Sequence, residues 1–313
     1  MVRFLAHRAL SGLVAAFVVA TLVFFVVQTF GPDPARSLLG KYANADTIAR
    51  KQHELGVDRP VAVQFADWLG GVLTGDLGHS WATTRTVSSA LADAVPITLT
   101  IATGALLLAG LLAVVLGIAA AERGGWIDAT LQVLVVVGFA VPGFWLALVL
   151  ASTLAVQLGW FPATGYTPPS VSIGGWLRSI TLPIAALCVS ITAALAQQLR
   201  NSILEVSRQD FVRTLRSQGI PQRTILFRHI LRNAASPMLT VASLQFIGAL
   251  SGAVIIERVF GLRGIGSLLE TASAKGDLPI LMGVVLFSVV AVVIVNLVID
   301  IAIGWVNPKV RVR

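Results

Sequence analysis

The stretch "FVRTLRSQGIPQRTILFRHILRNAASP", residues 211–237, decides how this chain is organised. It is basic and is interrupted by a Gly-Ile-Pro sequence, whereas the chain as a whole is 56% hydrophobic and only 12% charged. A basic segment between two long apolar runs indicates a loop at the surface of a membrane protein. Its arginines stand at five positions: Arg213, Arg216, Arg223, Arg228 and Arg232.

The interruption predicts a bent pair of helices. Helical spacing of apolar residues continues through 203–217, and Gly219 suits the C′ position, where a positive φ is needed. Pro221 suits the first turn of a second, amphipathic helix over 221–232. A Ser-Pro pair at 236–237 predicts the start of the next apolar helix. The expected pattern is a helix, a sharp turn, a short amphipathic helix and a return to the membrane.

The composition of the 313 residues is that of an integral membrane protein. A soluble chain of this length would carry roughly 25% charged residues. Cationic loops beside a membrane explain the net charge of +8, and no nucleic acid is expected as a partner, because the arginines lie between apolar runs. The single cysteine, Cys188, cannot form an internal disulfide, and the four scattered histidines predict no metal site.

The hydropathy gives the membrane spans, since a spanning helix needs about 20 mostly apolar residues. The first run is too long for the core of a signal peptide, so we interpret it as an uncleaved span. Backbone polar groups in hydrocarbon must pair within their own segment, which predicts helices and an all-α integral membrane protein. Six runs meet the requirement: residues 9–30, 97–120, 129–157, 180–203, 237–256 and 281–306.

Basic residues predict the orientation of the spans. They gather at the N-terminus (Arg3, Arg8), in the loop between the fourth and fifth spans, and at the C-terminus (309–313). Six spans place all three groups on one side, which the positive-inside rule assigns to the cytoplasm. We therefore expect both termini in the cytoplasm and the long loop 31–96 outside.

The outer loop contains an amphipathic segment, residues 59–81. Two interpretations stay open: a cap packed on the protein itself, or a docking surface for an external partner. The apolar face of the segment comprises Val63, Phe65, Trp68, Leu69 and Val72.

The basic stretch 211–237 also has two interpretations. One is an interfacial loop that binds anionic lipid head groups. The other is an element that protrudes into a groove of a cytoplasmic partner. A lipid-binding helix does not need a glycine hinge between two helical pieces, so the hinge favours the second interpretation.

The stretch resembles the cytoplasmic coupling loop of ABC importer permeases, in the form found in dipeptide/oligopeptide and nickel importers. The loop of that family runs approximately Tyr/Phe-Val/Ile-Arg-Thr-Ala-Arg-Ala-Lys-Gly, then an arginine-rich helix, then Arg-Asn-Ala-x-x-Pro. Residues 211–219 read FVRTLRSQG and depart from it at Leu215 and Gln218. The general importer motif Glu-Ala-Ala-x-x-x-Gly is not literally present, and residues 213–215 occupy its first three positions.

The resemblance covers nearly the whole chain and is closest to the B-type permease subunit. The segment GPDPA exchanges the order of Gly and Pro in the family's Pro-Gly-Asp-Pro-Ala. The matching segments are GPDPARSLLG (31–40), ELGVDRPVAVQFADWL (54–69), GDLGHS (75–80), WFPATGY (160–166), IERVFGLRGIGSLL (256–269) and NLVIDIAIGWVNPKVR (296–311).

The resemblance implies the fold of a type I ABC importer permease in the cytoplasmic membrane. Its partners would be a homologous C-type permease, two ATPase subunits or one fused ATPase, an extracytoplasmic solute-binding protein and membrane lipids. The chain itself would hold no cofactor, and ATP and Mg would bind to the ATPase subunits. The implied organisation is a tail and first span (1–30), an extracytoplasmic loop region (31–96) and a permease core (97–313) with a coupling loop (204–236).

Within the coupling loop, Gly219 and Pro221 are expected to form the turn. Ile225, Leu226 and Phe227 are expected to fill a groove of the ATPase, whose acidic rim the arginines would contact. The expected coupling residues are Arg213, Thr214, Arg216, Gly219, Ile220, Pro221, Arg223, Ile225, Leu226, Phe227 and Arg228.

The chain contains no GxxxxGK[ST] phosphate loop and no catalytic motif, so we expect a transport subunit without its own ATPase site. The resemblance favours di- or oligopeptides as cargo, with nickel, glutathione or another small solute as alternatives.

Polar residues inside the spans are candidates for the translocation path: Gln197, Gln198, Gln245 and Asp300. An acid within a membrane is a functional candidate, and a remote alternative is an ion-coupled transporter that works through Asp300. A structural ion pair of Asp300 and helix–helix contacts of the glutamines are the competing interpretations. Pro142 is expected to break the third span, as a hinge or as a static kink.

Overall fold

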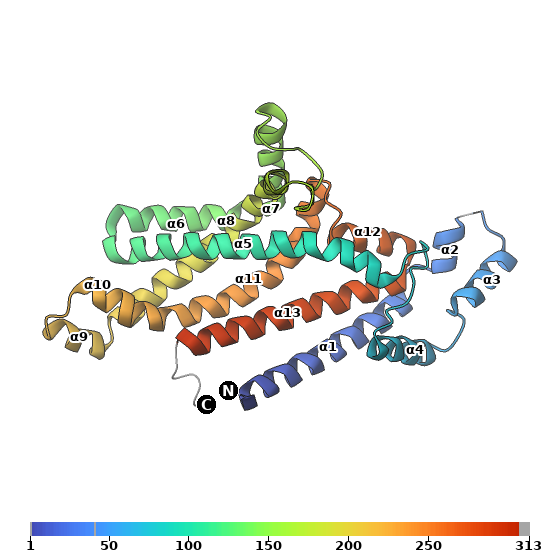
Figure 1. Ribbon diagram of the computed structural model, residues 1–313, viewed down its shortest axis with the longest axis horizontal. Helices are drawn as coiled ribbons and strands as arrows, with labels where there is room; N and C mark the ends of the chain where they lie inside the picture. The colour runs from blue at the N-terminus through green and yellow to red at the C-terminus, as the bar shows by residue number, and fades with distance from the viewer. Residues whose placement is uncertain (1, 41, 307–313) are drawn as a thin grey trace. The chain divides into compact units, whose positions relative to one another are not determined.

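The computed structural model describes residues 2–40 and 42–306, and most of them are helical (Figure 1). Within this part of the chain, the only strand-like pairing is an isolated bridge between His79 and Thr86, so the expected all-α fold is confirmed. The elements are α1 Val2–Phe30, α2 Pro34–Leu39, α3 Ala45–Leu55, α4 Val61–Thr74, α5 Val87–Arg123, α6 Gly125–Ala140, α7 Gly143–Leu150, the π-helix η1 Ala151–Gln157, α8 Ile173–Ser207, α9 Asp210–Ser217, α10 Gln222–Thr224, the π-helix η2 Ile225–Ile230, α11 Leu231–Val259, α12 Ile265–Lys275 and α13 Leu278–Val306.

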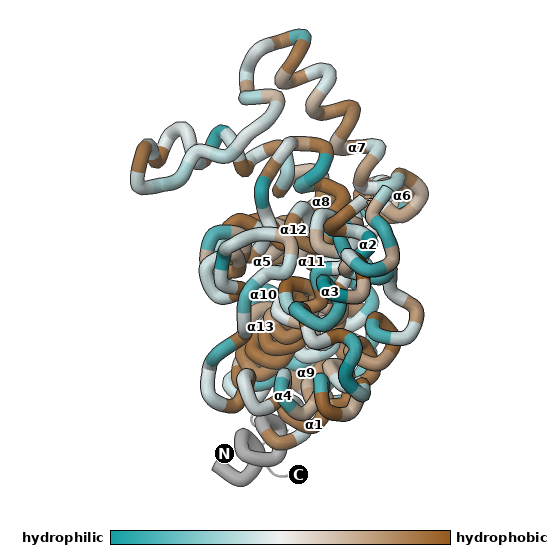
Figure 2. Tube along the Cα trace, turned by 90° about the vertical axis from the view of Figure 1, so that its right-hand side faces the viewer, coloured by the Kyte–Doolittle hydropathy of each residue, from teal (hydrophilic) through white to brown (hydrophobic). Residues whose placement is uncertain are grey.

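The chain forms two compact units, and α5 and α13 run through both. The larger unit consists mainly of Leu99–Gly261 and the residues from Ile294 onward, and the smaller unit consists of Arg3–Thr98 and Leu262–Val293. Hydropathy differs sharply along the chain: α13 is strongly apolar, whereas α2 and α3 carry many polar residues (Figure 2).

In the described part of the chain, five helices are long and apolar enough to cross a membrane. The remaining predicted span, 129–157, is a broken pair in which α6 and the segment Gly143–Gln157 meet at an angle of 94°. Val141 is extended and Pro142 caps the N-terminus of α7, as expected because a proline steers the preceding residue away from helical angles. The predicted break at Pro142 is therefore present, and the described residues contain six segments long and apolar enough to span a membrane if the pair counts as one.

Helix α8 is the central helix of the larger unit, where it packs against α6, α7 and α11. In the most apolar stretch of α8, 61% of the residues are buried, against 28% in the corresponding stretch of the helix Gln222–Val259. Small residues allow the close approach: a Cβ on Gly138 would lie only 2.9 Å from the Cβ of Ala193. Such contacts are typical of helix packing in membranes, where little hydrophobic driving force is available.

The fifth span does not begin where the sequence predicted. α10, η2 and α11 form one continuous helix, Gln222–Val259, so the start predicted at 236–237 is wrong, and Pro237 lies inside α11. The reason is tertiary, because a row of buried residues continues along the helix past the local break signal. We call this row the buried stripe; it comprises Ile225, Leu226, Ile230, Ala234, Met238, Ala242, Phe246, Ala249, Ala253 and Ile256.

A buried carboxylate organises the smaller unit. Asp277 is 2% exposed and directly precedes α13. It accepts hydrogen bonds from Ser80 Oγ at 2.5 Å and from the backbone N–H groups of Trp81 at 3.2 Å, Ala82 at 3.3 Å and Ile280 at 3.5 Å. One side chain therefore caps a spanning helix and holds the loop that precedes α5.

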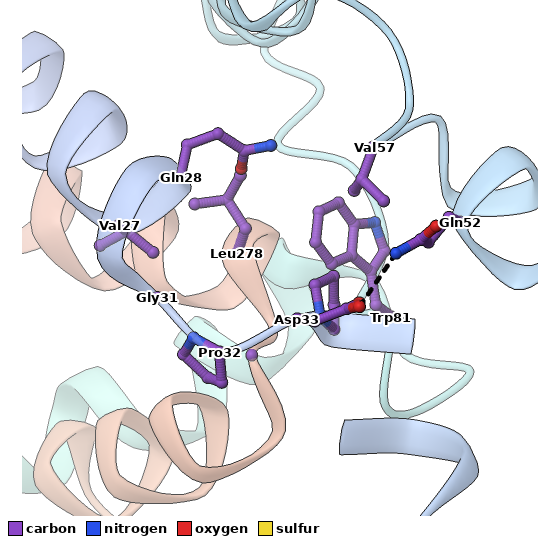
Figure 3. A pocket seen from close by; sticks show the side chains of 11 residues that line it. Val27, Gln28, Gly31, Pro32, Asp33, Gln52, Val57, Trp81 and Leu278 are labelled. Carbon is purple, nitrogen blue, oxygen red and sulfur yellow. Dashed lines mark hydrogen bonds between the residues drawn. The ribbon is translucent and has the colours of Figure 1, made fainter. Parts of the chain in front are cut away.

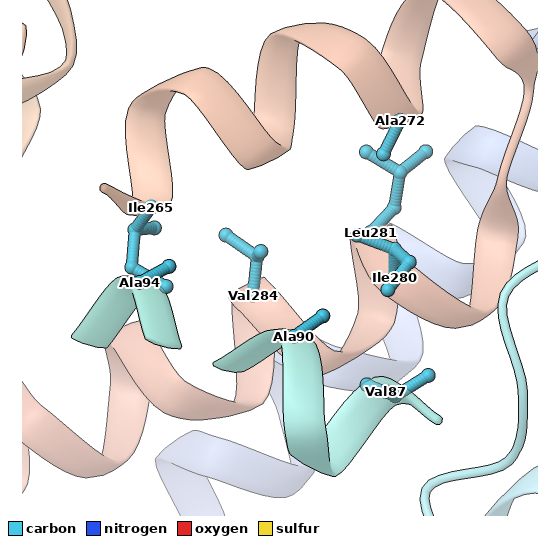
Figure 4. Packing of buried hydrophobic residues seen from close by; sticks show 8 residues of the cluster. All are labelled: Val87, Ala90, Ala94, Ile265, Ala272, Ile280, Leu281 and Val284. Carbon is cyan, nitrogen blue, oxygen red and sulfur yellow. The ribbon is translucent and has the colours of Figure 1, made fainter. Parts of the chain in front are cut away.

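Aliphatic side chains from α5, α12 and α13 pack together in the same unit (Figure 4). Gly283 permits the contact between α13 and α5, because a Cβ there would lie 2.4 Å from Val87 Cγ1. The cluster comprises Val87, Ala90, Ala94, Ile265, Ala272, Ile280, Leu281 and Val284.

Helix α4 is the amphipathic segment expected in the outer loop. Phe65 and Trp68 on its apolar face pack against Phe24 of α1, with ring centroids 5.2 Å and 5.9 Å from that of Phe24. Val63 on the same face is 43% exposed. The centre of the predicted apolar face is thus packed on the protein itself, which agrees with the first of the two interpretations of this segment.

Replacing Asp277 with alanine should destabilise the protein strongly, because it removes the acceptor of four hydrogen-bond donors. A buried donor without an acceptor costs about 1–3 kcal/mol, so we expect a loss of at least about 3 kcal/mol in the free energy of unfolding. The measurement is the unfolding midpoint in mild detergent. Asp67→Ala is the control, since it breaks only the exposed pair with Arg59, which is worth about 0–1 kcal/mol. Equal midpoints for the two variants would contradict the role of Asp277.

Candidate functional site

The candidate site is the segment 204–236, which we call the elbow. It contains α9, the turn that follows it, α10 and η2. Gly219 has φ of 73° and ends α9, where its N–H donates to Arg216 O at 3.0 Å and the N–H of Ile220 donates to Leu215 O at 3.3 Å. This pair of bonds is a Schellman motif, which requires the left-handed conformation that glycine adopts without strain. The turn expected at Gly219 is therefore present.

Pro221 sits one position earlier than predicted. It is the N-cap of α10, with φ −57° and ψ 138°, rather than a residue of the first turn. Because its φ is fixed by the ring and it has no N–H to satisfy, it directs the chain from the turn into the next helix.

The elbow has one buried side and one exposed side. Val212, Ile225 and Ile230 are each 0% exposed, and Leu226 is 1% exposed. The exposed residues of the other side include Arg213, Thr214, Arg216, Arg223, Phe227 and Arg228.

Electrostatically, the exposed side is a patch of weakly paired positive charge. The contact between Arg213 and Asp210 is long, at 3.4 Å, and both side chains are highly exposed, so it contributes little. Within the described part of the chain, no ion pair is formed by Arg216, Arg223 or Arg228. The patch can therefore pair with carboxylates of another molecule.

The structure divides the three apolar residues that were expected to fill a partner's groove. Phe227 is 59% exposed, but Ile225 and Leu226 lie inside the protein and are not accessible to a partner. Both residues lie in η2, where the N–H of Leu231 bonds to Leu226 O, five residues back, and both belong to the buried stripe. The two side chains anchor the elbow to the bundle instead.

The expected path residues are distributed over three helices. Gln197 and Gln198 are half-buried on α8, Gln245 is half-buried on α11, and Asp300 is half-buried on α13. Gln198 donates to Ser202 Oγ of its own helix at 3.2 Å, and the buried Oε1 of Gln197 accepts no hydrogen bond. Their part in a translocation path stays a prediction.

Sequence reasoning missed an ion pair that joins α6 to α8. Arg200 donates through Nε and Nη2 to the two carboxylate oxygens of Asp128, and the side chains are only 18% and 24% exposed. The signal was present, because Asp128 begins one span and Arg200 ends the next one. Opposite charges at the same end of consecutive antiparallel spans are natural partners.

These features define a class of protein: a multi-span membrane component with an exposed basic elbow rigidly joined to a spanning helix. Residues 113–312 match the family model "Binding-protein-dependent transport system inner membrane component", and residues 1–102 match the model of its N-terminal part. The chain belongs to this family and is the permease subunit of an ABC importer, an integral protein of the inner membrane.

Relatives match the chain from end to end. It is 36% identical over 312 residues to a protein of Brucella abortus (strain 2308) named as a peptide transport system permease, covering 99% of both chains. It is 33% identical over 314 residues to a glutathione transport system permease protein of Salmonella typhimurium (strain LT2), covering 100% of both. A crystal structure of an amino acid ABC transporter aligns with 75% of this chain and 97% of its own, at 17% identity and a TM-score of 0.49.

Neighbouring residues of the elbow should respond differently to truncation. Ile225→Ala should lower the free energy of unfolding by about 2–5 kcal/mol, because it opens a cavity beneath the elbow. Phe227→Ala should leave stability within about 0.5 kcal/mol, because the ring is exposed. Unfolding midpoints in detergent measure both changes. If Phe227→Ala were the more destabilising variant, the assignment of the two sides would be wrong.

Proposed function

We propose that this permease imports short peptides, in the size range from dipeptides to oligopeptides and including tripeptides such as glutathione. The observation that carries the proposal is likeness along the whole chain to permeases named for peptide and for glutathione transport. These two cargoes share the peptide bond and charged ends. Nickel or another small solute is the alternative cargo. The chain belongs to a family of binding-protein-dependent transport systems, so we do not propose the ion-coupled mechanism through Asp300.

The transporter that we propose contains more than this chain. A homologous C-type permease forms a heterodimer with it, two ATPase subunits or one fused ATPase bind from the cytoplasm, and a solute-binding protein docks from outside. Both termini and the elbow lie in the cytoplasm. ATP and Mg bind to the ATPase subunits, and this chain performs no catalysis of its own.

The elbow transmits the work of ATP hydrolysis in this scheme. Phe227 inserts into a groove of the ATPase, and the exposed arginines of the patch pair with carboxylates around it. Closure of the ATPase dimer displaces the elbow, and the buried stripe carries the displacement into α11 and against α8. The spans of the two permeases then rock and open the path to alternate sides.

The cargo is tested on the complex purified through this chain from its native membrane. Its co-purifying subunits are identified by mass spectrometry, and the binding protein is assayed with a dipeptide mixture, glutathione and Ni²⁺. Stimulation of ATP hydrolysis by a peptide-loaded binding protein is the expected result. Stimulation by Ni²⁺ alone would show that nickel, not a peptide, is the cargo. A chain that purifies without ATPase subunits would contradict the proposed assembly.

A proline at the turn should uncouple the transporter. Gly219→Pro forces φ to about −65° where the structure has 73°, so it distorts the turn, and transport should fall to background while the chain remains in the membrane. Gln222→Pro is the matched control, because it places a proline at the first position of α10, where its ring is tolerated. The measurements are cargo uptake and ATP hydrolysis in proteoliposomes. Normal uptake by Gly219→Pro would refute the role of the elbow.

A further inference from the structure

The smaller unit contains a cavity of about 310 Å³ at the end of α1 (Figure 3). Its walls come from the end of α1, the Pro-Asp-Pro segment 32–34, α3, the loop before α5 and the start of α13. Its polar lining residues include Asp33, Gln52 and Trp81.

The chemistry of the lining favours a cation. Among the described residues that line the cavity, only Asp33 is charged, and its side chain is 27% exposed, so its charge is partly shielded from water. The indole of Trp81 adds an aromatic face, which attracts ammonium and guanidinium groups. A lone carboxylate repels phosphate and other anions. A Lys or Arg side chain thus matches the cavity in charge.

The groups of the cavity are held in place before any ligand binds. Asp33 Oδ1 accepts from the N–H of Ala35 at 3.0 Å, and Asp33 Oδ2 accepts from Gln52 Nε2 at 2.9 Å. The backbone of Trp81 is fixed by its hydrogen bond to Asp277. Arg36 reaches Asp33 at 3.4 Å, but its side chain is 73% exposed and is a weak competitor. Binding to such a site costs little ordering.

We propose that this cavity is a docking socket for one Lys or Arg side chain of the extracytoplasmic binding protein. The inference rests on the proposed function, which places the loop region 31–96 outside. Helix α3, which supplies Gln52, is rich in charged residues and buries none of its own residues, so the rim of the socket faces water rather than lipid. Its volume lies at the lower limit of ligand pockets, which suits one side chain better than a whole peptide.

The test compares two isosteric variants in the complete complex. Asp33→Asn removes the charge and keeps the helix cap, because asparagine caps helices as well as aspartate does. Asp46→Asn is the control: it removes an exposed charge from the first turn of α3, away from the cavity. The readout is ATP hydrolysis as a function of the concentration of the purified binding protein. Nanodiscs of phosphatidylcholine and phosphatidylglycerol are used, because these lipids carry no primary ammonium.

We expect Asp33→Asn to raise the half-maximal concentration of binding protein about tenfold, which corresponds to about 1.4 kcal/mol, with an unchanged maximal rate. Asp46→Asn should behave as the parent. One Lys→Ala or Arg→Ala variant of the binding protein should show the same shift with the parent permease and no further shift with Asp33→Asn. Asp33→Ser, a second uncharged cap, serves if the asparagine variant folds poorly.

An unchanged half-maximal concentration for Asp33→Asn would overturn the socket while leaving the importer intact. A shift that appears only in bilayers with phosphatidylethanolamine would also overturn it, since the ligand would then be a lipid ammonium. A parent complex that no binding protein stimulates would remove the proposed function itself, and the socket with it.

Discussion

The buried stripe is the contact on which the rest of the larger unit depends. It begins at Ile225, inside the elbow, and ends at Ile256, so the elbow and the fifth span are one mechanical body. The continuous helix of 38 residues is roughly 57 Å long at 1.5 Å per residue. A loop joined to such a helix by flexible backbone would absorb a displacement, whereas side chains packed beneath the elbow transmit it. Dense packing makes this transmission stiff, because interiors have low compressibility.

In the smaller unit, hydrogen bonds to a buried carboxylate hold two segments together. Asp277 gives the start of α13 and the loop before α5 a common fixed point, since its carboxylate accepts from both. A buried carboxylate is costly unless every lone pair finds a donor, and here four donors converge on it. The same carboxylate also accepts from the backbone N–H of Trp81, a residue that lines the cavity. The arrangement of this region thus depends on one buried carboxylate, that of Asp277, and on the hydrogen bonds that it accepts.

Signals that act locally in the sequence predicted the fold well. Gly219 was predictable because a left-handed turn leaves few other choices of residue. The break at Pro142 was predictable because a proline steers the preceding residue away from helical angles. Signals that depend on tertiary packing were misread. Pro237 signals a helix start locally, but the buried stripe overrides it.

The candidate site shows the same limit more clearly. The arginines of the elbow were correctly expected at the surface, because a guanidinium is rarely buried without a partner. Hydrophobicity alone did not separate Phe227 from Ile225 and Leu226. Only the last two belong to the row of buried residues that continues along the helix. The pair Arg200–Asp128 was missed because its signal is not local: it appears only when the ends of two consecutive spans are compared.

This division separates the anchoring surface of the elbow from its exposed surface. The residues that hold the elbow to the bundle and the residues that face outward are different sets, although they alternate along the same few turns. Substitutions at exposed positions such as Arg223 or Phe227 change charge and shape toward a partner at little cost in stability. Substitutions at Ile225 or Ile230 change stability and leave the outer surface as it is. Recognition of a partner can therefore diverge among related permeases while the connection between elbow and membrane stays constant.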